Sequence, residues 1–278
     1  MKNILIAGAK SYIGESFKDY LEQYPNKYTV SVIDTKGLKL EADFFKDIDV
    51  VFCVVGVAHI KETAANRQLY FDVNRDLVIS IARVAKGAGV KQFILLSSMS
   101  VYGLTIGHIR KDTEPNPDTA YGESKLQADE KIKELENEDF IFTCLRPPMV
   151  YGENCTGNYQ RLRNFVLKSP IFPKYENKRS MIYIGNLCEF AKECIDKEKS
   201  GLFFPQNSEY VNTRKMVELI AEIHGKKIKL TKIFNWALKI APLRIVKKIF
   251  GDLTYEKVDV VDKYGLEKSI RNTEFLEV

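Results

Sequence analysis

The chain has 278 residues, of which 45% are hydrophobic, so it can bury a full core and is not a disordered segment. Its net charge of +5 comes from 42 basic and 37 acidic residues, without the block of like charges that typifies a nucleic-acid-binding arm. Five cysteines, an odd number without a CxxC pair, argue against a disulfide framework and a structural zinc site, so we expect a reducing cytoplasm and no metal. The N-terminus lacks the apolar region of a signal peptide, and no run of residues is long enough to span a membrane.

Short apolar runs alternate with helical patterns over the first hundred residues. The runs have strand length and no helical period, as expected for strands buried on both faces, and they cover residues 3–7, 28–33, 49–55 and 92–97. Between them, residues 13–23 and 75–88 carry apolar side chains at helical spacing, which gives a βαβ order. We therefore predict an α/β fold with a Rossmann-type, doubly wound parallel sheet. The interval 34–49 is short for a strand and a helix, and we place an abbreviated third strand near 38–42.

The second half of the chain continues this pattern and then becomes irregular. The predicted elements are a helix at 120–136, a strand at 140–145, a helix at 158–168, a strand at 181–184 and helices at 186–196 and 213–224. We expect an NAD(P)-binding Rossmann domain over 1–155 and a smaller substrate-binding lobe over 156–278, with the chain able to cross between the two. The basic amphipathic stretch 235–250 has the composition of a membrane-surface helix, but Pro242 interrupts it. We interpret it as a segment that packs on the smaller lobe with its apolar face and exposes its Lys and Arg side chains to solvent.

A glycine-containing turn lies between the first strand and the first helix. Gly8 and Gly14 frame Gly-Ala-Lys-Ser-Tyr-Ile-Gly, in which Ser11 takes the place of the middle glycine of the usual GxxGxxG. A helix N-terminus after a strand is where a pyrophosphate is held, although the same residues also suit a plain tight turn. Asp34 ends the second strand, where a carboxylate accepts from both ribose hydroxyls of NAD and repels the 2′-phosphate of NADP. Nearby Lys36 keeps NADP open as an alternative.

Tyr121 and Lys125 form the pair most informative about chemistry. Four residues apart on a helix, they share one face, so the ammonium can favour the ionised form of the phenol. The alternative is an exposed helical pair without a role. Ser98 follows the strand at 92–97, and ligands meet an open α/β sheet at the carboxyl ends of its strands. Its hydroxyl can therefore face the tyrosine across the nicotinamide.

With these motifs the chain resembles the extended short-chain dehydrogenase/reductase superfamily, in its nucleotide-sugar epimerase/dehydratase branch. The likeness extends from residue 1 to about 215. Beyond the motifs above, it rests on Ala-His59, Asp72-Val-Asn74, the stretch from Leu145 to Gly152 and the stretch from Lys178 to Asn186.

The resemblance implies roles for individual residues. Tyr121 is the expected acid/base, with Lys125 as its electrostatic partner and ribose ligand and Ser98 as the hydroxyl that bonds the reacting oxygen. The expected cofactor contacts are Gly8, Ser11, Tyr12, Ile13, Gly14, Asp34, Val55, Gly56, Asn74, Tyr121 and Lys125. The expected substrate contacts are Ser98, His59, Asn158 and Arg179. The guanidinium of Arg179 suits a diphosphate, the alternative being a surface ion pair, and His59 has a structural role as its alternative.

Departures from the family narrow the expected reaction. Sugar 4,6-dehydratases carry an Asp-Glu pair directly after the serine, whereas this chain has Met99 and Ser100. We therefore expect C4 epimerisation of a nucleotide-diphosphate sugar with NAD, in first place a UDP-sugar. Reduction of a nucleotide 4-keto-sugar with NAD(P)H and a non-catalytic dinucleotide-binding role are the alternatives. The expected assembly is a homodimer, without nucleic acid or a membrane span.

Overall fold

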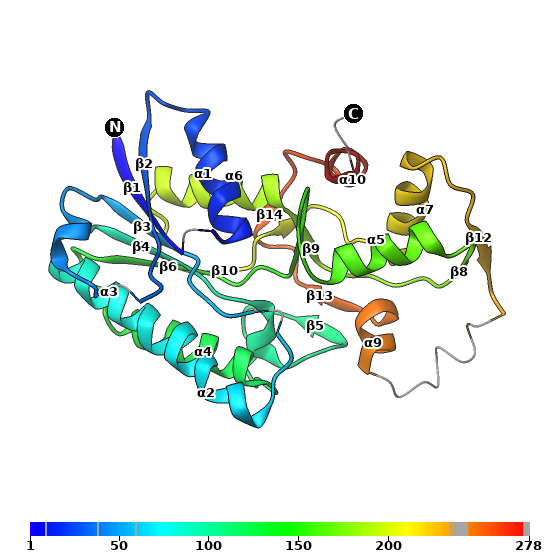
Figure 1. Cartoon of the computed structure of the whole chain (residues 1–278), viewed down its shortest axis with the longest axis horizontal. Coiled ribbons are helices and arrows are strands. Elements are labelled where there is room, and N and C mark those ends of the chain that lie inside the picture. Colours follow the sequence, from blue (N-terminus) through cyan, green and yellow to red (C-terminus); the bar gives the residue numbers. More distant parts are fainter. Residues whose placement is uncertain (9, 38, 59, 234, 236–243, 275–278) are drawn as a thin grey trace. The chain divides into compact units, whose positions relative to one another are not determined.

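The computed structural model describes residues 1–8, 10–37, 39–58, 60–233, 235 and 244–274 (Figure 1). The chain forms two compact units, each built from three chain segments, so it crosses between them more than once. Unit 1 comprises Met1–Gly103, Glu114–Pro147 and Cys188–Pro205. Unit 2 comprises Leu104–Thr113, Pro148–Leu187 and Gln206–Val278.

Unit 1 is built around a parallel sheet of six strands, which confirms the predicted fold class. In spatial order the strands are β10 (Gly201–Phe203), β6 (Ile141–Leu145), β4 (Gln92–Leu96), β3 (Val50–Cys53), β1 (Lys2–Ala7) and β2 (Tyr28–Ile33). Ile4 of β1 is paired with Val30 on one side and with Val50 on the other. The chain thus leaves β1 toward one edge of the sheet and returns on the other side for β3. A ligand crevice is expected outside the carboxyl ends of strands at such a switch point.

The predicted third strand near 38–42 is wrong. The described residues of this interval form no strand, and Ala42–Phe45 is a 3₁₀ turn that buries Phe45. Phe45 is the one fully buried anchor here, while charged side chains on both sides of it are exposed. Too few residues separate β2 from β3 for a further strand with its crossover helix. Strand β2 is therefore an edge strand, and its Val32 is 46% exposed.

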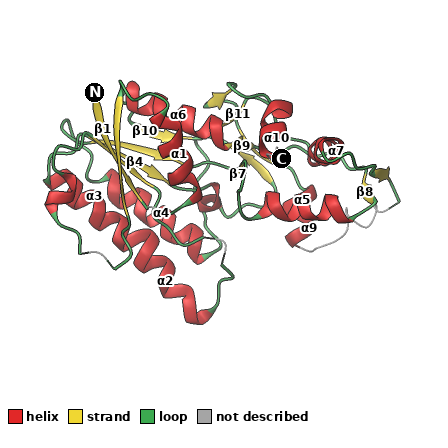
Figure 2. Ribbon diagram, turned by 45° about the horizontal axis from the view of Figure 1, so that its top comes forward, coloured by secondary structure: helices red, strands yellow, loops and turns green. Residues whose placement is uncertain are grey.

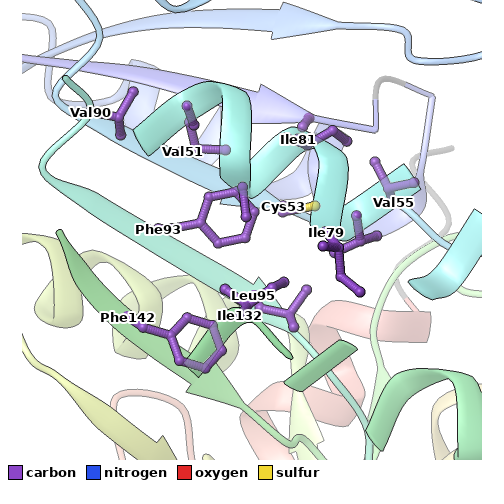
Figure 3. Packing of buried hydrophobic residues seen from close by; sticks show 14 of the residues in the cluster. Val51, Cys53, Val55, Ile79, Ile81, Val90, Phe93, Leu95, Ile132 and Phe142 are labelled. Atoms are coloured by element: carbon purple, nitrogen blue, oxygen red, sulfur yellow. The ribbon is translucent and has the colours of Figure 1, made fainter. Parts of the chain in front are cut away.

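Helices cover both faces of this sheet (Figures 1 and 2). In unit 1 the helical elements are α1 (Tyr12–Glu22), α2 (Arg67–Phe71), α3 (Val78–Gly87), α4 (Ala120–Lys133), the 3₁₀ turns Ala64–Asn66 and Met99–Tyr102, and the π-helical turn Asp72–Leu77. Helix α6 (Ile184–Asp196) begins in unit 2 and ends in unit 1. Figure 3 shows one face, where strand residues such as Val51, Phe93 and Leu95 pack with Ile81 of α3. On the opposite face, Phe17 of α1 lies 4.4 Å from Phe52 of β3 between ring centroids.

Unit 2 combines four parallel strand pairs with short helices. The pairs are β7 (Met149–Tyr151) with β9 (Met181–Tyr183), β8 (Ile171–Pro173) with β12 (Lys229–Thr231), β5 (Gly107–Ile109) with β13 (Leu253–Tyr255), and β11 (Gln206–Asn207) with β14 (Val260–Val261). The helices are α5 (Asn158–Lys168), α7 (Thr213–Ile223), α9 (Arg244–Phe250) and α10 (Leu266–Glu274). Tyr151 stacks on Tyr159 at 5.5 Å between ring centroids, and the Tyr159 hydroxyl donates to Glu274 at 2.6 Å. These contacts fasten α5 and α10 to β7.

The basic stretch predicted at 235–250 is described in part. Helix α9 packs Phe250 against Phe172, with ring centroids 5.7 Å apart, and leaves Lys247 and Lys248 exposed. Helix α9 thus packs on unit 2 with its apolar face, as predicted for this stretch. Residues 236–243 lie outside the described part of the chain. No helix among the described residues is long and apolar enough to cross a membrane.

Candidate active site

The turn after β1 brings the backbone close to the end of β3. Gly8 adopts φ +108°, and a Cβ atom on it would lie 3.0 Å from the Val55 nitrogen and 3.1 Å from the Val54 carbonyl carbon. Any side chain at this position would therefore meet rigid backbone as well as an unfavourable φ. The turn consequently requires glycine at the β1–β3 switch point, where a dinucleotide is expected to bind.

Ser11 has a structural role that accounts for its place in the motif. Its hydroxyl caps α1 by accepting from the Gly14 nitrogen at 3.1 Å. A Cβ atom on Gly14 would lie 2.7 Å from this hydroxyl, so the cap and the last glycine depend on each other. Tyr12 and Ile13 form the start of the helix, whose first N–H groups have no carbonyl partner within the helix. The resulting N-terminus suits a phosphate group.

Asp34 lies directly after β2 on the surface. Its carboxylate accepts from the Lys36 backbone nitrogen at 3.1 Å and lies 3.3 Å from the Lys10 ammonium. The hydrogen bond from Lys36 and the pairing with Lys10 lower the pKa of Asp34. The residue is thus ionised at neutral pH, as an acceptor for ribose hydroxyls must be.

Tyr121 and Ser98 meet at the end of β4. Helix α4 begins at Ala120 because Thr119 caps it, accepting from the Gly122 nitrogen at 3.2 Å. Ser98 caps the next 3₁₀ turn, accepting from the Ser100 nitrogen at 3.1 Å, and its hydroxyl lies near the Tyr121 phenol. Burial raises the pKa of Tyr121, and the Ser98 hydroxyl offsets part of that rise. The phenol is therefore protonated at neutral pH in this structure.

Lys125 lies on the same helix but contacts the strand ends. Its buried ammonium donates to the carbonyls of Leu96 at 3.0 Å and Val55 at 3.2 Å. Burial lowers the pKa of Lys125, whereas nearby Asp129 acts to raise it. Lys125 is not among the groups that shift the pKa of Tyr121, because its ammonium is directed to backbone carbonyls. Burial has the largest effect on the pKa of the phenol.

Asn74 and Gly56 complete the group at the end of β3. Asn74 is fully buried in the π-helical turn, accepts from the Val57 nitrogen at 2.6 Å and donates to the Ser124 hydroxyl at 3.2 Å. A Cβ atom on Gly56 would lie 3.1 Å from the Lys125 ammonium. Asn74 thus ties the loop after β3 to α4, while the lack of a side chain at Gly56 leaves room for the Lys125 amine. A π-turn at such a position is frequent in functional sites.

A buried ion pair behind this group was not predicted. The Asp129 carboxylate accepts from the Arg146 guanidinium at 3.0 Å and from the Ser97 hydroxyl at 2.7 Å, through the same oxygen. Arg146 also donates to the Tyr102 hydroxyl at 2.8 Å. The available signals were an acid four residues after Lys125 and an arginine directly after a buried strand. Spacing alone does not show that these two side chains meet.

Of the expected substrate residues, Ser98 lies in unit 1, Asn158 and Arg179 lie in unit 2, and His59 is outside the described residues. A guanidinium nitrogen of Arg179 donates to the Gly251 carbonyl at 2.8 Å. Burial lowers the pKa of Arg179 to about 10, with Asp252 acting in the opposite direction, so the side chain remains charged at neutral pH. Asn158 is exposed at the start of α5, after Gly157 with φ +93°. No group of His, Cys, Asp and Glu within the described ranges is arranged to hold a metal ion.

Comparison with known proteins places the chain in a family. The model of the NAD dependent epimerase/dehydratase family matches residues 4–203. UDP-glucose 4-epimerase of Vibrio cholerae is 29% identical, with 94% of this chain and 85% of that protein aligned. N-acetyl-alpha-D-glucosaminyl-diphospho-ditrans,octacis-undecaprenol 4-epimerase of Escherichia coli O157:H7 is 25% identical over 81% of this chain and 73% of that protein. In fold, the chain is similar to the crystal structure of UDP-glucuronic acid 4-epimerase from Bacillus cereus in complex with NAD. The TM-score is 0.77 and the sequence identity is 18%, and the match covers 98% of this chain and 95% of that one. Since the family model covers most of its length, the chain belongs to the NAD dependent epimerase/dehydratase family.

Proposed function

We propose that the protein is an NAD-dependent 4-epimerase of a nucleotide-activated hexose, in first place a UDP-hexose. The observation that carries the proposal is the proximity of the Tyr121 phenol to the Ser98 hydroxyl at the carboxyl end of β4, with Lys125 buried on the same helix as Tyr121. This set can move a proton to and from a sugar hydroxyl. Two curated relatives, 29% and 25% identical, are named as 4-epimerases.

The residues around the switch point fit a dinucleotide. A Cβ atom on Gly8 would meet backbone at 3.0 Å, and one on Gly56 would crowd the Lys125 ammonium at 3.1 Å, so both glycines keep the strand ends accessible. We assign the pyrophosphate to the N-terminus of α1 and the adenosine ribose to Asp34. NAD, when bound, supplies an acceptor for the C4 hydride.

The proton steps belong to the protein. In its ionised form, which the positive charge of an oxidised nicotinamide would favour, Tyr121 takes the proton of the sugar O4 hydroxyl as C4 is oxidised. It returns the proton when C4 is reduced on its other face, so the cycle leaves no net redox change. Ser98 hydrogen-bonds the same oxygen and keeps it close to the phenol. Met99 and Ser100 provide no second acid and base, which disfavours loss of water from the sugar.

Unit 2 is the proposed holder of the sugar nucleotide. Arg179, with a pKa of about 10, carries a charge that can pair with a diphosphate at neutral pH. Asn158 is a neutral donor and acceptor at the start of α5 and is proposed to bind the same group. The name of the E. coli relative gives a sugar linked through a diphosphate to undecaprenol as its substrate. The turnover assay therefore has to identify the group that the diphosphate carries on the side away from the sugar.

Turnover tests the function directly. Purified protein should convert a UDP-hexose to its C4 epimer without added reductant, and protein denatured after gel filtration should release NAD(H). UDP-glucose, UDP-N-acetylglucosamine and UDP-glucuronic acid, assayed by nuclear magnetic resonance, separate the sugars. Oxidation of NADH or NADPH by a nucleotide 4-keto-sugar, with no epimerase activity on any of the three, would instead establish the reductase.

Cofactor preference gives a second test of the same assignment. Because the Asp34 carboxylate should bond the ribose hydroxyls and repel a 2′-phosphate, NAD(H) is expected to bind at least about tenfold more tightly than NADP(H), or about 1.4 kcal/mol. The variant Asp34→Ala should lose this preference in calorimetry. Lys10→Ala is the matched control, and it should retain or increase the preference because it removes the ammonium 3.3 Å from the carboxylate. Equal or reversed affinities in the wild type would favour the reductase.

A further inference from the structure

Positive charge is concentrated at one edge of unit 2. Residues 154–175 and 223–233 together contain eight Lys or Arg and no Asp or Glu, which leaves 34 basic and 37 acidic residues in the rest of the chain. Parallel pairing of β8 with β12 brings the two segments together, with Ile171 opposite Lys229 (Figures 1 and 2). The protein's net positive charge thus gathers around one strand pair.

Most of the charges on this edge are uncompensated, although Arg163 pairs with Glu274 at 2.7 Å. Five lysines are exposed there and form no ion pair with any described residue, and they are Lys168, Lys174, Lys227, Lys229 and Lys232. Of the acidic residues that flank the two segments, Glu176 and Glu222 are already engaged, while Glu153 precedes the first segment and is exposed. Glu176 pairs with Arg214 at 3.0 Å, and Glu222 pairs with Arg271 at 3.0 Å. We call the five lysines, with the apolar residues described next, the basic edge.

Large apolar side chains project among these lysines. Ile233 is 72% exposed, Phe165 is 48% exposed and Ile171 is 39% exposed. Backbone hydrogen bonds join the two segments, because the Lys229 nitrogen donates to the Pro170 carbonyl at 2.9 Å and the Lys174 nitrogen to the Thr231 carbonyl at 2.7 Å. Ile171 lies in β8, Ile233 follows β12, and Phe165 of α5 packs on Phe172 of β8 with ring centroids 6.0 Å apart. Exposed aliphatic groups within a cationic surface match the chemistry of an anionic lipid interface, where lysines meet head groups and apolar side chains enter the acyl boundary.

We propose that the basic edge docks unit 2 peripherally on an anionic lipid membrane. A second copy of the chain is a poor occupant, because a two-fold contact would set the same uncompensated lysines against each other. Nucleic acid would use the charges but would gain nothing from exposed isoleucines. The proposal is independent of the epimerase assignment, since it uses no residue of the candidate active site.

Vesicle co-sedimentation of the full chain tests the docking. Vesicles of phosphatidylcholine with phosphatidylglycerol should bind the protein, with affinity falling as salt rises, whereas pure phosphatidylcholine should bind it weakly. Each lysine at such a surface contributes about fivefold in affinity, so Lys229→Glu with Lys232→Glu should weaken binding at least about 25-fold. Ile171→Ser with Ile233→Ser should weaken it about tenfold, through loss of apolar contact.

Lys46→Glu with Lys133→Glu is the matched control, since both lysines are exposed in unit 1. This variant should bind vesicles like the wild type. All three double variants should keep wild-type turnover of a water-soluble substrate, which separates failure of docking from failure of the proposed function. Absence of binding to anionic vesicles, an equal loss in the control, tighter binding to duplex DNA, or a changed oligomeric state in the edge variants would overturn the proposal.

Discussion

Replacing Tyr121 by phenylalanine is expected to lower kcat by about 10² to 10⁴, the usual contribution of a general acid–base group. The substitution keeps the ring and removes only the hydroxyl that lies near Ser98. Because that hydroxyl acts on the reacting oxygen, the loss should appear in kcat, with little change in the affinity for the UDP-hexose. Steady-state kinetics and calorimetry on the same preparation separate the two effects.

Tyr70 offers a matched control for this experiment. Its ring lies edge-on to that of Tyr121, with centroids 6.4 Å apart, and its hydroxyl donates to the Ile60 carbonyl at 3.1 Å. Tyr70→Phe therefore removes a neighbouring phenol that has no proposed part in the proton transfer, and kcat should stay near the wild-type value. Full turnover by Tyr121→Phe, on whichever sugar the wild type accepts, would disprove the mechanism.

The features that the sequence predicts well are those that local pattern determines. The strands β1, β3 and β4 are continuous apolar runs because a parallel strand is buried on both faces. Ser98 and Tyr121 could be placed at a strand end and a helix start for a similar reason, since both are recognisable in the sequence; their roles stay predictions. Helix α5 was predicted at its observed bounds, Asn158–Lys168.

The features that the sequence did not reveal depend on tertiary pairing. Strand β10 has only three residues and exists because it pairs with β6 at Leu202 and Cys144. The prediction of a strand near 38–42 was wrong because the interval between β2 and β3 is too short for a further strand with its crossover helix. This interval contains the 3₁₀ turn Ala42–Phe45 instead, which buries Phe45. Lys125 lies on the predicted helix, but its partners are carbonyls at the ends of two strands, which no spacing rule indicates.

The buried ion pair of Asp129 and Arg146 also depends on tertiary pairing that the sequence did not reveal. Breaking it is expected to have a large effect on stability. Asp129→Asn should lower the free energy of unfolding by about 3 to 5 kcal/mol, because it leaves the arginine charge buried without its counterion. Arg146 is 7% exposed and Asp129 is 4% exposed, so water cannot replace the lost partner. Urea unfolding, analysed for both the midpoint and the slope, measures the change.

Replacing Asp129 and replacing Arg146 should not lower the stability by the same amount. Burial raises the pKa of Asp129, and Arg146 is among the groups that offset this rise. In Arg146→Met the carboxyl group can therefore relieve its burial by taking up a proton, whereas an arginine left alone in Asp129→Asn cannot lose its charge. Arg146→Met should thus cost less than Asp129→Asn. The double variant should cost less than the sum of the two single changes, because the residues are in contact.

An exposed ion pair on the same helix provides the control. Lys131 and Glu134 lie 2.9 Å apart with side chains 55% and 62% exposed, so Glu134→Gln should change the free energy of unfolding by less than about 1 kcal/mol. A loss in Asp129→Asn no larger than this would show that the buried pair does not hold α4 in place. A large loss, with the double variant partly restored, would show that it does. Since Tyr121 and Lys125 occupy the two preceding turns of α4, the pair would then stabilise the element that carries the proposed chemistry.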